Sequence, residues 1–145
     1  MTKALDLVRK VQRGEAAPPP IATLIGFTLT EVDPGRAVVA FDAGPRHLNP
    51  MGTLHGGVLC DIADAAMSMA YAASLDEGET FTTLELKINF LKPVRAGRLV
   101  ATGRLVKGGH TVGLLECDVV DDKERLVARA SSTCMTLRGE QAVGR

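Results

Sequence analysis

The chain has 145 residues, of which 46% are hydrophobic, and its 17 Lys and Arg residues balance 17 Asp and Glu residues. A chain of this length can bury a core within one domain, and its hydrophobic content excludes a disordered tail or adaptor. The zero formal net charge gives no overall attraction to nucleic acid or to an anionic membrane, so neither is expected as a partner.

Apolar runs and cysteines bear on the compartment. No uninterrupted apolar stretch reaches about 18 residues, and Arg9 and Lys10 interrupt the start of the chain, so we expect neither a transmembrane helix nor a signal peptide. Cys60, Cys117 and Cys134 are scattered, odd in number and without metal-binding or redox spacing. We therefore expect free thiols, no metal site and a cytoplasmic location.

The first 20 residues are predicted to form a short helix and a proline-rich connector. Apolar residues recur at helical spacing within residues 3–13, and Gly14 ends this pattern. Residues 18–20 are three consecutive prolines, which stiffen the chain. We assign residues 1–20 to this N-terminal segment and residues 21–140 to the main domain.

The main domain is predicted to contain a hairpin, one long helix and four further strands. Residues 27–32 alternate polar and apolar side chains, residues 33–35 form a turn, and residues 36–41 return as a second strand. An irregular loop over residues 44–53 leads to a helical pattern from Gly56 to about Leu75. The four later strands are predicted at residues 81–91, 98–106, 111–120 and 125–137.

The long helix is apolar on nearly all sides, which places it inside the fold. An antiparallel sheet of five or six strands, curled around this helix, would bury most of it. The expected class is therefore α+β, with a short N-terminal helix outside the curl. One sheet leaves part of the helix uncovered, so we expect a second copy of the chain to cover the rest and form a homodimer. A dimer of dimers is the expected larger assembly, but the faces of the sheet decide between dimer and tetramer, and the sequence leaves that choice open.

Two acidic residues interrupt the apolar helix. At about 100° per residue, Asp61, Asp64, Ser68 and Tyr71 fall in one narrow stripe. A carboxylate among alanines and methionines is costly to bury, and such acids often have the raised pKa that a base or nucleophile needs. Asp61 is near enough to the helix start to serve only solvation or helix stability, whereas Asp64 is more than two turns in and favours a functional role.

The start of the helix carries the pair Gly56-Gly57. Two glycines leave the backbone N–H groups uncovered at the positive end of the helix dipole, where a developing oxyanion would be stabilised. The alternative is that they only allow a tight turn into the helix or close packing. Gly56 and Asp64 are about 12 Å apart along the axis, so one reacting carbon cannot touch both. Two helices lying antiparallel across a twofold axis would bring Gly56 of one chain to Asp64 of the other.

The sequence around this helix resembles a known family. The run from His47 to Gly57, His-Leu-Asn-Pro-Met-Gly-Thr-Leu-His-Gly-Gly, is followed by Ile62-Ala63-Asp64. With the later Phe90-Leu91-Lys92-Pro93 and Ala128-Arg129-Ala130, it resembles the hotdog-fold thioesterases of the phenylacetyl-CoA thioesterase type. The resemblance covers roughly residues 20 to 137. It implies a hotdog fold and hydrolysis of acyl-CoA thioesters to free acid and CoA.

The resemblance also implies roles for individual residues. Asp64 matches the family's catalytic acid, as general base on water or as nucleophile forming a mixed anhydride. Gly56 would donate its N–H to the thioester carbonyl, and Asn49, from the chain opposite Asp64, would help to hold that carbonyl or the water. Thr83 is in register to position the water, whereas Thr82 points to the other face of its strand.

His55 and the coenzyme contacts are left more open. His55 either acts as a catalytic base or orients Asn49 and its loop by hydrogen bonding. The resemblance implies no separate cofactor, because CoA is part of the substrate. Its phosphates attract Lys, His and glycine-rich backbone, so contacts are expected from the turn at 107–110 and from basic residues elsewhere. The candidates are Lys92, Arg95, Lys107, Gly109 and His110.

The acyl group is not specified by the sequence beyond an aryl or medium-chain class. We expect Met67, Met69, Tyr71 and loop residues to line its pocket, because flexible methionines suit varied apolar groups. Two alternatives share the fold: a hydratase or dehydratase acting on acyl thioesters, and a non-catalytic acyl-CoA-binding protein. The Gly-Gly pair after His55 and the spacing to Asp64 fit the thioesterases better than the hydratases, and a pure binding protein would have no use for Asp64.

Overall fold

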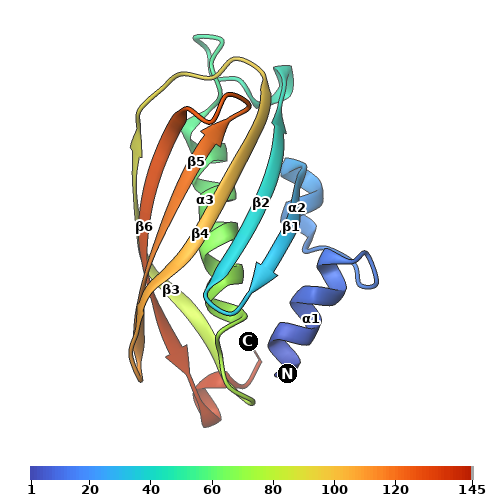
Figure 1. Cartoon of the computed structure of the whole chain (residues 1–145), viewed down its shortest axis with the longest axis vertical. Helices are drawn as coiled ribbons and strands as arrows, with labels where there is room; N and C mark the ends of the chain where they lie inside the picture. Colours follow the sequence, from blue (N-terminus) through green and yellow to red (C-terminus); the bar gives the residue numbers. More distant parts are fainter. Residues whose placement is uncertain (145) are drawn as a thin grey trace.

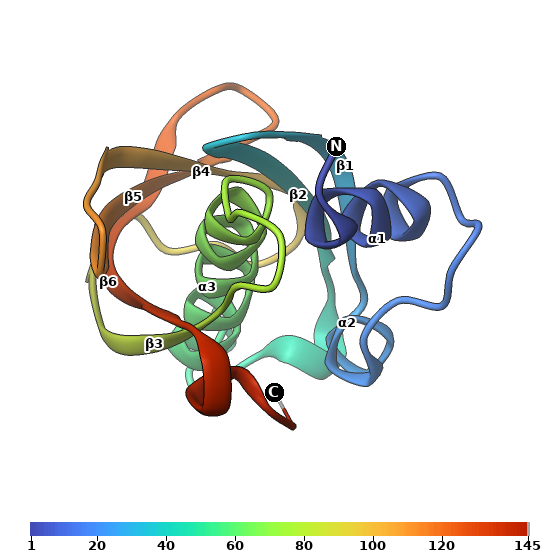
Figure 2. The ribbon, with the colours of Figure 1, turned by 90° about the horizontal axis from the view of Figure 1, so that it is seen from below.

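The computed structural model describes residues 1–144 as an α+β fold in which one antiparallel sheet curls around a central helix (Figures 1 and 2). The six strands run in the order β1-β2-β4-β5-β6-β3, so β1 and β3 are the edges. The predicted architecture is thereby confirmed. The strands are β1 (Phe27–Asp33), β2 (Arg36–Ala43), β3 (Thr80–Phe90), β4 (Gly97–Gly108), β5 (Val112–Asp121) and β6 (Leu126–Leu137), and the helices are α1 (Lys3–Gln12), α2 (Pro20–Ile25) and α3 (Gly56–Ala72), with 3-10 turns at Pro45–His47 and Gly139–Ala142.

The central helix α3 lies close against the sheet because small residues face each other across the contact. Ala63, Ala66 and Ala70 are fully buried. A Cβ atom on Gly103 of β4 would come within 2.5 Å of the Ala66 carbonyl, so only glycine fits there. Gly113 of β5 lies in the same way under the ring of Tyr71. These two glycines fix both the distance and the rotation of α3 on the sheet.

The sheet leaves one side of α3 uncovered, as expected from its apolar pattern. Figure 2 shows the strands wrapping α3 on several sides, with a gap between the β3 edge and the N-terminal helices. The residues of α3 that stay half-buried on this side are Val58, Asp61, Asp64, Ala65, Ser68 and Met69. A single chain therefore buries most of the helix but not the stripe that carries its two acids.

Two boundaries differ from the sequence expectation. α3 ends at Ala72, one turn earlier than predicted, and the Ser74 hydroxyl donates to the Tyr71 carbonyl at 2.7 Å. Pro20, expected to belong to the connector, is instead the first residue of the short helix α2. Proline is tolerated at the first helical position because its missing N–H would have no partner there. Gly26, with a φ of 93°, ends α2.

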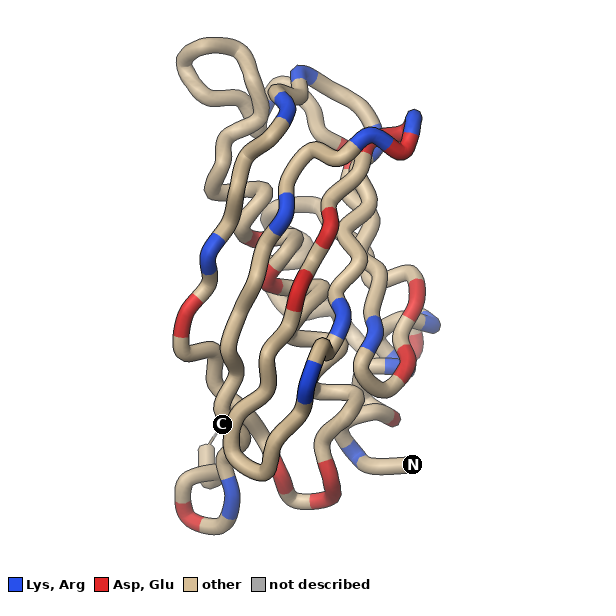
Figure 3. Tube along the Cα trace, turned by 60° about the vertical axis from the view of Figure 1, so that its left-hand side comes forward, with Lys and Arg blue, Asp and Glu red and all other residues tan. Residues whose placement is uncertain are grey.

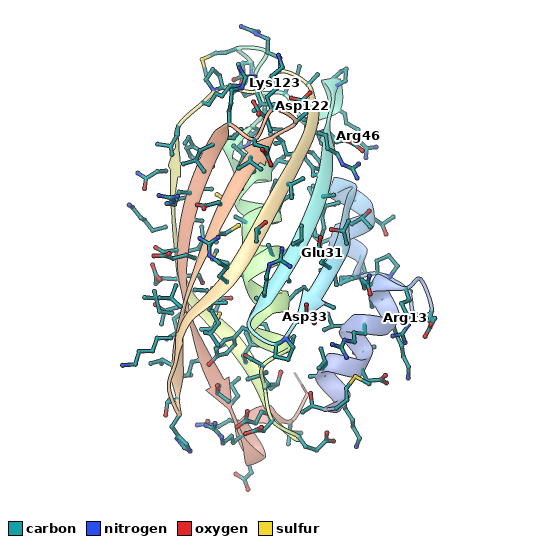
Figure 4. All side chains as sticks on the ribbon, viewed as in Figure 1. Arg13, Glu31, Asp33, Arg46, Asp122 and Lys123 are labelled. Carbon is teal, nitrogen blue, oxygen red and sulfur yellow. The ribbon has the colours of Figure 1, made fainter. Side chains whose placement is uncertain are left out.

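The N-terminal segment is attached to the β1 edge of the sheet (Figure 2). Leu5 and Val8 of α1 are buried in the common core. Arg9 pairs with Asp33 at the end of β1, over 3.4 Å, and Gln12 donates to the Thr30 carbonyl at 3.0 Å. Figure 4 shows Asp33 on β1 facing the α1 side of the molecule and Arg13 at the outer end of α1. The segment before residue 20 is therefore packed on the main domain.

Charged residues are distributed without a dominant sign. Figure 3 shows Lys and Arg interspersed with Asp and Glu along the strands and at both ends of the molecule. On the outer face of the sheet, Asp118 accepts from Arg129 at 2.7 Å and from Arg104 at 3.4 Å. Among the described residues, no helix has the length and hydropathy needed to cross a membrane.

Candidate active site

Asp64 lies in the middle of α3, on the side that the sheet leaves uncovered. Its carboxyl group is half-buried. Burial raises its pKa above the usual range, the negative charge of Asp61 adds to that shift, and the Ser68 hydroxyl one turn later acts in the opposite direction. The pKa of Asp61 is also raised, through burial. Such an acid holds its proton more readily than an exposed one, and its ionised form takes up a proton more readily, as a general base must.

A cavity of about 720 Å³ adjoins this carboxylate. Asp61, Asp64 and Ser68 of α3 line it, together with Met69 of the same helix. On the opposite side the cavity is lined by β1 and by the segment between α1 and α2. Its volume lies in the range of small-molecule sites. The predicted stripe of acids therefore does border a cavity.

The predicted lining is wrong for Met67 and Tyr71. Met67 is 1% exposed and Tyr71 is 3% exposed, so both are core residues on the sheet side of α3. The Tyr71 hydroxyl instead forms a 2.8 Å hydrogen bond with Thr136 of β6. A stripe estimated at 100° per residue cannot tell which of its members the sheet will cover, and here the sheet covers Tyr71.

The N-terminus of α3 forms a second, separate part of the site. The Nδ1 atom of His55 accepts the N–H of Gly57 at 2.9 Å, which caps the helix. In the described part of the chain, no hydrogen bond engages the N–H of Gly56. A Cβ on Gly56 would lie 2.8 Å from the tip of the exposed Phe90 ring, so a larger residue there would require that ring to move. His55 thus serves as a helix cap, and Gly56 keeps a free donor.

Asn49 lies beside this helix end and organises its loop. Its Nδ2 atom donates to the Thr53 hydroxyl at 2.9 Å, and its Oδ1 atom accepts the N–H groups of Met51 and Thr53 at 3.0 and 3.2 Å. The expected contact with His55 is replaced by these bonds. A primary amide carries two N–H donors, so Asn49 retains one donor beyond the bond to Thr53. Asn49 and Gly56 line the same cavity, of about 380 Å³, with Phe90.

His47 has a structural place in the same loop. Its Nδ1 atom accepts the Gly44 N–H at 3.1 Å, and its Nε2 atom lies 2.9 Å from the Ile25 carbonyl. Its ring packs edge-on against Phe41. Both ring nitrogens are therefore engaged in holding the loop to the end of α2.

Thr83 faces the core side of β3. It is paired across the sheet with the buried Cys134, and its hydroxyl is 3.8 Å from the Cys134 sulfur. Burial raises the pKa of the Cys134 thiol, and the charge of Asp64 is among the smaller contributions in the same direction. Asp64 and Thr83 therefore approach Cys134 from different elements. Thr82 pairs with Met135 instead, and adjacent strand residues point to opposite faces.

The candidate coenzyme residues do not gather in one place. Lys92 lies at the Gly56 end of α3 and borders the cavity that contains Asn49. Lys107, Gly109 and His110 belong to the β4–β5 hairpin, at the opposite end of the molecule (Figure 1). In one chain the predicted set is thus divided between the two ends.

More cations surround Lys92 than the sequence pattern suggested. Asp121 forms ion pairs with Arg125 at 2.9 Å and with Lys92 at 3.2 Å. Burial opposes ionisation of Asp121, yet hydrogen bonds from Arg125, Lys92 and Lys123 hold its pKa well below the usual range. Arg95 donates to the Gly52 carbonyl at 3.3 Å. Figure 4 places Asp122 and Lys123 at this end of the molecule.

The segment between α1 and α2 is the part of the site that sequence reasoning missed. It lines the Asp64 cavity over residues 14–19 although it is remote from Asp64 in sequence. Its only local signal is the proline run, which indicates a stiff connector without saying where it packs. No group of three or more His, Cys, Asp or Glu side chains in the described residues is arranged to hold a metal ion.

Comparison with known proteins places this geometry in a family. Residues 51–128 match the model of the thioesterase superfamily. A 1,4-dihydroxy-2-naphthoyl-CoA hydrolase of Listeria monocytogenes is 31% identical over 109 residues, which are 75% of this chain and 89% of that protein. Human acyl-coenzyme A thioesterase 13 is 24% identical, covering 92% of this chain and 96% of that protein.

Solved structures agree with this assignment. A phenylacetic acid degradation-related protein of Ralstonia eutropha superimposes with a TM-score of 0.80 at 34% identity, covering 88% of this chain and 98% of that chain. The PaaI protein of Escherichia coli, at 24% identity, superimposes with a TM-score of 0.82 over 94% of this chain and 98% of that chain. The second likeness bears on the fold alone.

Proposed function

The chain belongs to the thioesterase superfamily and is a hotdog-fold thioester hydrolase, and on that premise we propose that its substrates are acyl-CoA thioesters with aryl or medium-chain acyl groups. One observation carries the proposal: Asp64, which lies in the middle of the central helix and has a raised pKa, borders a cavity of about 720 Å³. The names of relatives that hydrolyse CoA thioesters point to the same substrate class.

In the proposed reaction, the carbon–sulfur bond of the thioester breaks and a carbon–oxygen bond forms. Asp64 either takes a proton from the attacking water or attacks the carbonyl itself to give a mixed anhydride that water then hydrolyses. Both routes release the free acid and the CoA thiol. The Gly56 N–H stabilises the negative charge that develops on the carbonyl oxygen, with Asn49 and Thr83 positioning the carbonyl or the water. His55 supports this arrangement as the helix cap.

We propose that two chains share each site. Gly56 and Asp64 are about 12 Å apart along α3, too far to contact one carbonyl. The uncovered side of α3 and the unpaired edge strand β3 offer surfaces for a second copy. Exposed Leu84 and Phe90 on β3 support burial of that edge. A homodimer with antiparallel α3 helices completes two equivalent sites, and a dimer of dimers is the proposed assembly.

The nucleotide of CoA is proposed to bind to basic residues at the rim of the site. Lys92 borders the Gly56 cavity, and Arg95, Arg98 and Arg125 line the adjoining pocket together with Asp121 and Asp122. Lys107, Gly109 and His110 form the second candidate group, at the other end of the chain. The proposed location is the cytoplasm, where the three free thiols, Cys60, Cys117 and Cys134, would stay reduced.

The test is the variant Asp64→Asn, assayed by thiol release on a panel of aryl and aliphatic acyl-CoA thioesters. We expect turnover to fall by about 100-fold or more, the scale of a lost general base or nucleophile, while the folded state is retained in circular dichroism. Asp61→Asn is the matched control, because it removes a neighbouring carboxylate from the same cavity and should leave most turnover. Full activity of Asp64→Asn would exclude the proposed mechanism.

A further inference from the structure

The large cavity is built from two parts of the chain with different relations to the family. The carboxylate and its helical neighbours lie within residues 51–128, the range that matches the superfamily model. The remaining lining comes from residues 11–39, outside that range. Asp64 thus lies within the range of the family model, and most residues that line the opposite wall precede that range.

The cavity extends away from Asp64 toward the N-terminal segment. Phe27, Thr28 and Leu29 of β1 line its middle. Residues 14–19 line it on the far side, and Figure 2 shows the segment between α1 and α2 beyond β1 as seen from α3. An acyl group with its carbonyl at Asp64 would therefore pass across β1 toward this segment.

The far segment is anchored at both of its ends. At its start, the N–H groups of Glu15 and Ala16 both donate to the Lys10 carbonyl, at 2.8 and 3.2 Å. At its end, three prolines lead into α2, where Ala22 is 5% exposed. α1 is fixed to β1 by its buried residues and by the Gln12 bond to the Thr30 carbonyl. A wall anchored on both sides limits what fits, whereas a loose loop would yield.

The charges of the lining restrict the occupant further. The acidic residues Glu15, Asp61 and Asp64 line the cavity, and no Lys, Arg or His of the described residues does. At the far end the Glu15 carboxylate is already paired with the Arg13 guanidinium, over 2.7 and 2.8 Å, so a ligand carboxylate there would compete with Glu15 for this cation and find no other in the lining. An uncharged apolar group meets no such penalty.

We infer that residues 11–19 form the distal end of the acyl pocket and restrict the enzyme to uncharged acyl groups of limited length. The inference rests on the proposed function, and it names the specificity determinant of the same site. Shortening the pocket at its far end should discriminate between long and short acyl groups, because one methylene too many in a fixed pocket costs about 10-fold or more in kcat/KM.

The length test uses Ala16→Phe, which adds a ring at the distal end. We expect kcat/KM for decanoyl-CoA to fall by about 10-fold or more while that for butyryl-CoA changes by less than about 2-fold. Leu29→Ala is the opposite variant, because it widens the middle of the cavity. It should raise kcat/KM for acyl groups longer than decanoyl relative to kcat/KM for decanoyl-CoA. Thr23→Phe is the matched control, since Thr23 is an exposed α2 residue outside the lining.

The charge test compares octanoyl-CoA with suberyl-CoA, which has a carboxylate at the far end of an equally long chain. Wild-type enzyme should prefer octanoyl-CoA, and Glu15→Lys should narrow that preference. Glu31→Lys is the control, because Glu31 is an exposed β1 residue outside the cavity.

The outcomes distinguish a failure of the proposed function from a failure of the inference about residues 11–19. Hydrolysis of no acyl-CoA at all would overturn the proposed function. Hydrolysis in which Ala16→Phe and Leu29→Ala change short and long substrates by the same factor would overturn this inference and leave the proposed function standing. Binding of S-decyl-CoA, a thioether that cannot be hydrolysed, to Asp64→Asn gives a readout without turnover, and Ala16→Phe should weaken it.

Discussion

The two parts of the site on α3 are built from different materials. At the helix start, the candidate groups are the Gly56 N–H and the side-chain amide of Asn49, which otherwise hydrogen-bonds within its own loop. Lys92 and three arginines lie nearby, together with two aspartates. At mid-helix, the functional group is a carboxylate in a cavity with further acidic residues. The first part suits the anionic coenzyme and the developing oxyanion, and the second suits an uncharged acyl group. In the proposed mechanism, neither part alone contains all the groups that hydrolysis needs.

The largest expected effect tests whether the two parts belong to different chains. Asp64→Ala and Asn49→Ala dimers should each have little activity alone, and turnover of Asp64→Ala should fall by about 100-fold or more. Mixed in equal amounts with subunit exchange, they should recover about a quarter of wild-type activity, because half of the dimers are hybrids with one intact site each. Thiol release per chain is the measurement.

The matched mixture combines the Asp64→Ala/Asn49→Ala double variant with wild type. If the site is shared, every site in a hybrid dimer has one damaged half, so only the wild-type dimers are active and about a quarter of the activity remains. If each chain holds a whole site, about half of the activity remains. Absence of recovery in the first mixture, with exchange verified by mass spectrometry, would contradict the shared site.

A smaller effect should separate the two candidate coenzyme regions. Lys92→Gln is expected to raise KM for acyl-CoA by up to about 5-fold, the scale of a solvent-exposed charge contact. The same change should be absent with an acyl-pantetheine thioester, which has no nucleotide. Lys107→Gln is the matched variant at the other end of the molecule. A larger KM effect for Lys107→Gln would move the nucleotide to the β4–β5 hairpin.

The smallest effect is a shift in the pH dependence of kcat. Burial and the charge of Asp61 raise the pKa of Asp64, and only the ionised carboxylate acts as base or nucleophile, so activity is lost as the pH falls through that raised pKa. Asp61→Asn removes one cause and should move the acid limb to lower pH, with no change on the alkaline side. Asp122→Asn, in an exposed hairpin, is the control. An unmoved acid limb in Asp61→Asn would show that the two acids are not coupled.

The sequence predicted the fold well because its signals are local. Alternating strands and turn residues mark β1 and β2, and the apolar helix marks the centre of the sheet. It placed Asp61, Asp64 and Ser68 on one side of α3 because residues on one helix keep a fixed spacing, and these three side chains line one cavity. It misplaced Tyr71 because the direction from which a sheet covers a helix is a tertiary property.

Other parts of the site depended on contacts that no local pattern carries. The hydrogen bonds of Asn49 are closed within its own loop, and the division of Lys92 from Lys107 follows from strand order. The wall formed by the N-terminal segment was likewise invisible, since helix periodicity in α1 indicates only that the helix has a buried face. Propensity and spacing predict elements, and packing decides which of them meet.

The two glycines beneath α3 have a consequence for how substrate range can change. Because Gly103 and Gly113 admit no side chain, α3 cannot shift or turn on the sheet without a collision, and the position of its carboxylate is inherited with the sheet. Variation is less constrained in the first 26 residues, which end at a left-handed glycine and pack mainly on the edge strand β1, with fewer contacts between α1 and α3. Exchanging this segment between relatives is therefore a route to new acyl selectivity with the reaction chemistry untouched.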